Sequence, residues 1–148
     1  SVLERQTSGC MISFEGPEVV LGISLSVLST ELQDLKKIGE VLPEGAVKDF
    51  KSEGDKCSFK VKGGVAIHLE KDLEALPEGM ILRLHTVAPS PVKFSLDVIA
   101  SDHSDGCSCH VRSDADLNPF TRMMVEPALK SLFEQMAEGM VKRFPISP

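Results

Sequence analysis

The feature that most constrains the fold is an alternation of apolar and polar residues, which continues with interruptions from Cys57 to Leu117. The interruptions are Gly63-Gly64, the LPEG sequence at 76–79 and the SDHSDG sequence at 101–106, all typical of turns. Successive side chains of a strand point to opposite faces, so the pattern predicts short antiparallel strands with one apolar face. The apolar positions are Cys57, Phe59, Val61, Val65, Ile67, Leu69, Met80, Leu82, Leu84, Val92, Phe94, Leu96, Val98, Cys107, Cys109, Val111, Ala115 and Leu117.

A long helix is predicted to follow the last strand and to cover this apolar face. Asn118 is a suitable N-cap and Pro119 suits the first helical position. Pro127 is expected to kink the helix or to split it in two. The apolar residues at helical spacing are Leu129, Leu132, Phe133, Met136, Met140 and Phe144, opposite Lys130, Glu134, Glu138 and Lys142.

The N-terminal third has a different pattern. Residues 3–14 are predicted to form a first strand, and a leucine repeat at helical spacing follows it. We expect a helix whose first turn contains Pro17 and which Gly39 or Pro43 breaks or ends. The repeating leucines are Leu21, Leu25, Leu28, Leu32 and Leu35.

The sequence HSDGCSCH at 103–110 admits two interpretations, half of a metal or redox site or part of a strand. In a strand, Cys107 and Cys109 share the apolar face and His110 points to the other face. A zinc site needs four converging ligands, and cysteines two apart on one strand rarely reach disulfide geometry. The other cysteines, Cys10 and Cys57, also lie in apolar alternations. The strand interpretation is therefore favoured, with the thiols in the core or in a cavity wall.

The remaining polar residues do not form a recognisable catalytic or metal-binding pattern either. His68, His85 and His110 are expected on the outer face of the sheet and His103 in a turn, while Asp114 and Asp116 would face solvent together. The sequence has no glycine-rich phosphate loop, no nucleophile elbow and no histidine–glutamate metalloprotease pattern. We expect no metal, no cofactor and no catalytic residue.

Size and charge exclude several classes of partner. We expect residues 1–148 to form a single domain. The net charge of −6, without a basic stripe, argues against nucleic acid as a partner. The longest apolar stretch, at 19–28, is too short to span a bilayer, and residues 1–10 carry charge where a signal peptide needs an apolar segment. The interpretation is a cytoplasmic protein with reduced thiols and no integral membrane association.

Two segments carry a resemblance to a known superfamily, LPEGAVKDFKSEGDKCSFKV at 42–61 and ADLNPFTRMMVEPALKSLFEQMAEGM at 115–140. With the order of elements over the whole chain, they make the sequence similar to the START-like, helix-grip superfamily (SRPBCC), which includes pollen-allergen-type proteins, lipid carriers and polyketide cyclases. It looks closest to a group of small uncharacterised bacterial members. The resemblance implies an α+β fold, in which a seven-stranded antiparallel sheet grips the long C-terminal helix and two short helices follow strand 1.

The resemblance also implies a cavity between sheet and helix and hence a function, the non-enzymatic binding or transport of a hydrophobic small molecule or lipid. A cyclase- or hydratase-like enzyme is a second hypothesis, but the inward-facing positions offer it only thiols, Thr86 and Ser113. A protein-interaction module, as in the co-chaperone branch of the superfamily, is a third. The expected cavity residues are Phe59, Val61, Ile67, Leu82, Leu84, Phe94, Leu96, Cys107, Cys109, Val111, Met124, Leu132, Met136 and Met140.

Overall fold

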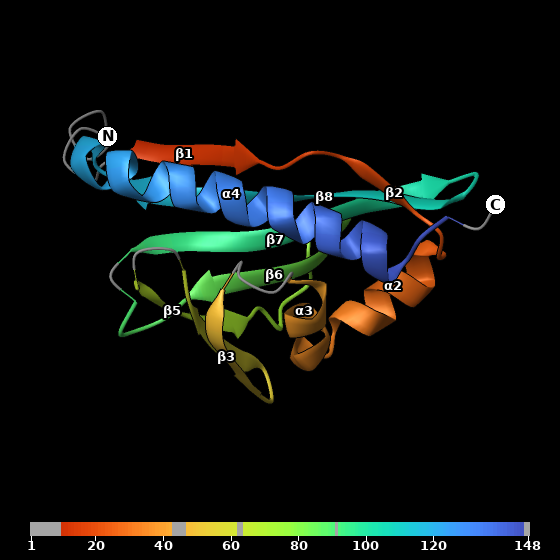
Figure 1. Cartoon of the computed structure of the whole chain (residues 1–148), viewed down its shortest axis with the longest axis horizontal. Coiled ribbons are helices and arrows are strands. Elements are labelled where there is room, and N and C mark those ends of the chain that lie inside the picture. Colours follow the sequence, from red (N-terminus) through yellow and green to blue (C-terminus); the bar gives the residue numbers. More distant parts are fainter. Residues whose placement is uncertain (1–9, 43–46, 62–63, 91, 147–148) are drawn as a thin grey trace.

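The computed structural model describes residues 10–42, 47–61, 64–90 and 92–146. Its strands form one antiparallel sheet in the order β1-β8-β7-β6-β5-β4-β3, and β2 also pairs with β8 (Figure 1). The fold is α+β, as predicted. The elements are β1 (Cys10–Glu15), β2 (Val19–Leu21), α2 (Leu25–Leu32), α3 (Leu35–Val41), β3 (Lys48–Glu53), β4 (Lys56–Lys60), β5 (Ala66–Lys71), β6 (Met80–Thr86), β7 (Lys93–His103), β8 (Gly106–Leu117) and α4 (Pro119–Arg143).

The strands β1 and β2 act as one interrupted strand along β8. Phe14 pairs with Ser113, and after the interruption Val19 pairs with Cys109. Between the two strands the Gly16 N–H donates to the Val111 carbonyl at 2.7 Å, which holds the chain against β8. A Cβ at position 16 would lie 2.9 Å from the Cβ of Phe133 on α4, so glycine allows this close approach. The expected seven-stranded sheet is therefore observed, with its first strand in two parts.

The leucine repeat does not form one helix, and the prediction of a helix from Pro17 is wrong. Leu21 belongs to β2 and pairs with Cys107, because β8 offers the backbone there a hydrogen-bonding edge. The first helix begins only at Leu25, where the Ser24 hydroxyl accepts the Val27 N–H. Asp34 caps a second helix by accepting the Lys36 N–H at 3.0 Å. Two short helices thus follow the first strand, as the resemblance implies, and α3 runs through Gly39.

The long C-terminal helix α4 begins where the sequence predicts. Asn118 and Thr121 form a reciprocal capping box, in which the Asn118 side chain accepts the Thr121 N–H at 2.8 Å and Thr121 Oγ1 accepts the Asn118 N–H at 3.1 Å. The helix continues unbroken through Pro127 to Arg143, so the expected split does not occur. No helix in the described parts of the chain is both long and apolar enough to cross a bilayer.

The core lies between α4, the short helices and the inner face of the sheet (Figure 1). Leu28, Leu32, Leu35 and Ile38 bury the apolar sides of α2 and α3 against it. The predicted apolar stripe of α4 is buried from Leu129 to Met140. Alternation along β8 is regular, with every second residue from Cys107 to Leu117 buried. The sheet and the helix thus meet through the faces that their periodicities predict.

Candidate functional site

Most of the inner face is packed core. Eleven of the fourteen residues predicted to line a cavity are at most 3% exposed and belong to one continuous cluster of buried apolar side chains, and ten of these eleven do not border the pocket described below. Side chains of this cluster therefore fill most of the space between the inner face of the sheet and the helices. These ten residues are Phe59, Leu82, Leu84, Leu96, Cys107, Cys109, Val111, Leu132, Met136 and Met140.

The other four predicted residues border a pocket of about 500 Å³ under the N-terminal half of α4. Val61, Ile67 and Phe94 come from the sheet, and Met124 comes from the helix. Sequence reasoning did not assign the other six to the cavity, although five of them lie in or beside patterns already recognised. Val65 and Val92 belong to the strand alternations, Leu129 belongs to the helical stripe, and Val125 and Ala128 lie beside that stripe. The described lining residues are Val61, Val65, Ile67, Val92, Phe94, Thr121, Met124, Val125, Ala128 and Leu129.

The pocket has a wet end and a dry end. At the wet end, Met124 is 62% exposed on the second turn of α4. At the dry end, Ile67 and Leu129 are 2% and 3% exposed and join the core. A molecule in this pocket would therefore enter past Met124 and reach a floor of branched aliphatic side chains.

Among the described residues of the pocket lining, Thr121 alone has a polar side chain, and the helix cap already occupies it. Thr121 Oγ1 lies 2.9 Å from Asn118 Oδ1 and 3.2 Å from the Asn118 carbonyl oxygen, either of which can accept its proton. It also accepts the Asn118 N–H. The walls consequently offer van der Waals contact and apolar surface rather than hydrogen bonds.

The cysteines behave as the strand interpretation predicts. Cys107 and Cys109 point into the core, and Cys109 Sγ lies 4.0 Å from Met140 Sδ. Burial raises the pKa of the Cys57 thiol to about 11 and that of the Cys109 thiol to about 12. Raised pKa values keep these thiols protonated and chemically quiet at neutral pH. The described residues contain no cluster of three or more histidine, cysteine or acidic side chains that could hold a metal ion.

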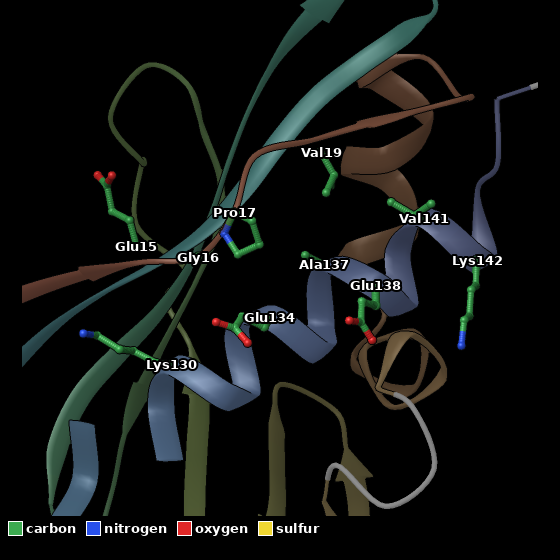
Figure 2. Close-up of a pocket in the computed structure, with 10 residues that line it drawn as sticks. All are labelled: Glu15, Gly16, Pro17, Val19, Lys130, Glu134, Ala137, Glu138, Val141 and Lys142. Atoms are coloured by element: carbon green, nitrogen blue, oxygen red, sulfur yellow. The ribbon is translucent and has the colours of Figure 1, made fainter. Parts of the chain in front are cut away.

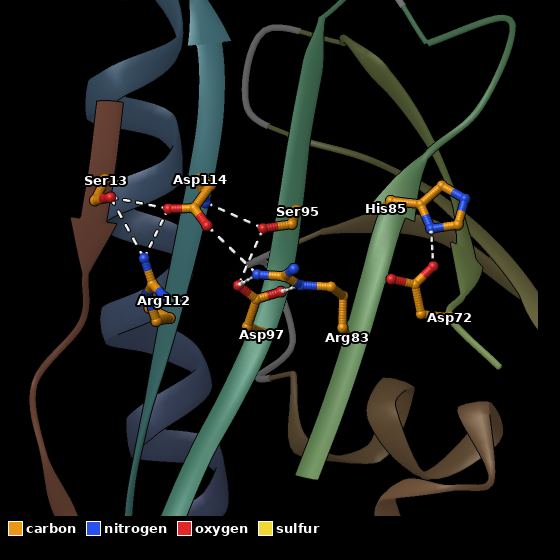
Figure 3. Close-up of polar contacts among 8 residues, drawn as sticks. All are labelled: Ser13, Asp72, Arg83, His85, Ser95, Asp97, Arg112 and Asp114. Carbon is orange, nitrogen blue, oxygen red and sulfur yellow. Dashed lines mark hydrogen bonds and ion pairs between the residues drawn. The ribbon is translucent and has the colours of Figure 1, made fainter. Parts of the chain in front are cut away.

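The outer face of the sheet carries a polar network that the sequence pattern did not predict (Figure 3). Asp97 alternates with the apolar residues Leu96 and Val98 of β7 and so belongs to the outer face, yet the structure buries it completely. Arg83 binds it through two parallel hydrogen bonds of 2.9 and 3.0 Å, and Ser95 donates a third of 3.1 Å. The bond to Asp97 raises the pKa of the Arg83 guanidinium above its usual value. A fully paired carboxylate of this kind fixes β6 against β7.

The network extends across two further strands. Asp114 on β8 accepts a hydrogen bond of 2.7 Å from Arg112 and one of 2.8 Å from Ser13 on β1. The Asp114 N–H also donates to Ser95 Oγ at 3.0 Å. Beside these residues, His85 Nδ1 lies 2.8 Å from Asp72 Oδ1 (Figure 3). Both residues border a shallow depression in the surface. The side chains of the network are paired with one another across neighbouring strands, which identifies the network as a cross-strand clamp.

A second, larger hollow lies between the β1–β2 segment and the solvent side of α4 (Figure 2). Its volume is about 760 Å³, and its floor is formed by Gly16 and Ala137. Charged side chains surround it, namely Glu15, Lys130, Glu134, Glu138 and Lys142. This open groove follows from the interruption between β1 and β2. The pocket under the N-terminal half of α4 is more enclosed and more apolar, so it is the stronger candidate for small-molecule binding.

Comparisons with known proteins show the fold. No protein-family model and no curated protein sequence matches the chain. Among solved structures, norcoclaurine synthase from Thalictrum flavum is 14% identical with a TM-score of 0.69, over 94% of this chain and 89% of that one. The KanY protein is 10% identical with a TM-score of 0.68, over 90% and 97% of the two chains. A protein from Chromobacterium violaceum is 14% identical with a TM-score of 0.58, over 92% and 98%.

These structures share one architecture, and the chain has the START-like helix-grip fold, as the sequence resemblance predicts. That fold serves ligand-binding proteins and cyclase-like enzymes alike. The choice between such functions therefore depends on the site of this chain rather than on its fold.

Proposed function

We propose that the protein binds a small hydrophobic molecule, without chemical conversion, in the pocket under the N-terminal half of α4. The observation that carries this proposal is the part of the lining that the structure describes, which consists of nine apolar side chains and one hydroxyl already used by the helix cap. The volume of about 500 Å³ lies within the range of small-molecule sites. A relative in fold, norcoclaurine synthase, has been solved with dopamine and hydroxybenzaldehyde, which shows that this architecture accommodates small aromatic molecules.

Apolar contact alone is sufficient for useful affinity. Each buried methylene group contributes about 0.8 kcal/mol, so about ten of them give a gross gain of about 8 kcal/mol. The loss of translational and rotational freedom on binding reduces this gain in free energy, so we expect an affinity no tighter than micromolar. Because the deeper part of the helix–sheet interface is filled by Leu132, Met136 and Met140, the ligand is short rather than a full lipid.

The lining of this pocket argues for binding rather than catalysis. General acid–base chemistry needs a titratable group within hydrogen-bond reach of the substrate. None of the described lining residues is titratable, and the Thr121 hydroxyl already has partners within the cap. The cyclase-like alternative would thus need a group from outside this pocket.

A specific observation favours the other alternative, a protein-interaction surface. Phe120 and Met123 are 73% and 79% exposed on the first turns of α4, and Met124 lies beside them. Exposed large apolar side chains in a group are typical of contact surfaces. The pocket proposal and the interaction proposal therefore concern adjacent parts of one helix and can be tested together.

The test measures the fluorescence of N-phenyl-1-naphthylamine, an uncharged probe that brightens in apolar surroundings. We expect Ala128→Phe, which fills the pocket, to weaken binding at least about tenfold because the ring occupies the ligand's volume. Glu134→Phe is the matched control, since it adds the same ring to the same helix outside this pocket. Native mass spectrometry of the purified protein, followed by solvent extraction, would identify a retained ligand.

Two outcomes would contradict the proposal. Equal affinity of the wild type and Ala128→Phe would place the probe elsewhere. Loss of probe binding in Phe120→Ser and Met123→Ser, with Ala128→Phe unaffected, would transfer the binding to the exposed group on α4 and favour the interaction surface.

A further inference from the structure

The solvent exposure of the pocket lining differs between its two ends, and this difference restricts which ligands the pocket can hold. Its dry end is formed by Ile67 and Leu129, which are almost fully buried, and its wet end by Met124, which is mostly exposed. A polar group at the wet end can keep its water. A polar group carried to the dry end loses its water and must find a partner in the wall.

The wall has no such partner among its described residues. Thr121 is the single polar side chain among the described lining residues, and its hydroxyl is engaged with Asn118 as donor and as acceptor. The buried hydroxyl of Ser113 lies on the inner face, but Ser113 is not among the described lining residues. The charged residues of α4 nearest the lining are paired with each other, Glu126 with Arg122 and Lys130 at 3.5 Å.

We propose that the pocket accepts molecules with at most one polar end, inserted apolar end first, and rejects molecules that are polar at both ends. This inference rests on the proposed function and narrows its ligand class to short monofunctional alkyl or aryl compounds. The head group remains beside Met124, so its identity contributes little, whereas a distal hydroxyl is buried without a hydrogen bond whichever end enters first.

The test compares 1-octanol with 1,8-octanediol by titration calorimetry on the whole protein. The two have the same carbon chain, and the diol adds one hydroxyl at the far end. We expect the diol to bind at least about tenfold more weakly than 1-octanol, the effect of one buried, unpaired hydroxyl. Affinities within about threefold of each other would overturn the inference while leaving the proposed function intact. Failure of both compounds to bind, at concentrations where the fluorescent probe also fails, would instead count against the proposed function.

A pair of variants tests the direction of insertion. Leu129→Gln places an amide at the dry end, and Met124→Gln places the same amide at the wet end. We expect the first variant to reduce the preference for 1-octanol over the diol, because the amide supplies the missing partner, and the second to leave it unchanged. A reduced preference in Met124→Gln alone would overturn the proposed direction. If Leu129→Gln does not fold, the wild-type comparison of the two alcohols still decides the ligand class.

Discussion

Along α4, the segment from Leu132 to Met140 is packed against the sheet, whereas the segment from Thr121 to Leu129 borders an apolar pocket and leaves Met124 exposed. The packed half fills its interface with Phe133, Met136 and Met140. The open half presents smaller side chains to the sheet, among them Ala128 and Val125. One helix therefore combines a packed structural anchor with one wall of an apolar pocket, and the change in side-chain volume along the helix separates the two.

The largest expected effect comes from truncating the packed half. Phe133→Ala should lower the free energy of unfolding by about 3–5 kcal/mol, because Phe133 is fully buried and its removal leaves a cavity. Met124→Ala, in the open half, should change it by less than about 0.5 kcal/mol. Urea unfolding of both variants measures the difference. A cost above about 1.5 kcal/mol for Met124→Ala would show that the open half is packed in solution.

The second largest expected effect comes from the polar clamp on the outer face of the sheet, which supports both halves of the interface. Arg83→Met removes the partner of the fully buried Asp97 and should cost about 3 kcal/mol of unfolding free energy. Both residues face away from the pocket, so affinity for N-phenyl-1-naphthylamine should not change. The double variant Arg83→Met with Asp97→Asn should recover part of the loss, because no buried charge remains unpaired. A single-variant cost below about 1 kcal/mol would contradict the clamp.

The sequence predicted those parts of this comparison that depend on local periodicity. The alternation from Cys57 to Leu117 gave the strands and their inner face, and Asn118 and Pro119 gave the start of α4. Local patterns were misleading where pairing with a strand far away in the sequence decides the secondary structure. Leu21 matches a helical repeat, but pairing with β8 makes it a strand residue.

The same limit applies to polar residues and to the pocket. The alternation of β7 puts Asp97 on the outer face, where polar side chains are expected, but it does not indicate the burial of Asp97 beneath its contacts with Arg83 and Ser95. Similarly, the helical stripe marks Leu129 and Leu132 as equivalent apolar positions. Which of them meets a filled interface and which meets a pocket depends on the volumes facing it across the sheet, and these come from separate strands.

A smaller effect concerns the thiols of the packed half. The pKa of Cys109 is about 12 in the folded protein, above the value of about 8.5 for an exposed thiol. The folded state thus keeps a proton that the unfolded chain releases, and this contribution is complete below about pH 8.5 and is lost as the pH rises toward 12. The free energy of unfolding should fall between pH 8 and pH 10.5, and it should fall less in Cys109→Ala. An identical fall in wild type and variant would contradict the assignment.

The smallest expected effect lies at the boundary between the two halves. Ser113 is on β8 between Val111, which pairs with Val98 in the packed core, and Ala115, which pairs with Phe94 at the pocket. Its hydroxyl is fully buried and finds no hydrogen-bond partner among the residues that the structure describes. An unpaired buried hydroxyl is destabilising, so Ser113→Ala should raise the free energy of unfolding by about 1 kcal/mol.

Ser95→Ala is the matched control for this prediction. Ser95 is also buried, but its hydroxyl donates to Asp97 and accepts the Asp114 N–H. The same substitution there should lower the free energy of unfolding by about 1–3 kcal/mol, because it leaves the carboxylate and the backbone amide short of a partner. If urea unfolding gives opposite signs for the change in unfolding free energy of the two variants, the inner face at the boundary favours an apolar side chain and the outer face favours a hydrogen-bonding one. Equal losses would mean that the Ser113 hydroxyl is bonded, and that the boundary between the packed half and the pocket contains a polar group that a ligand could reach.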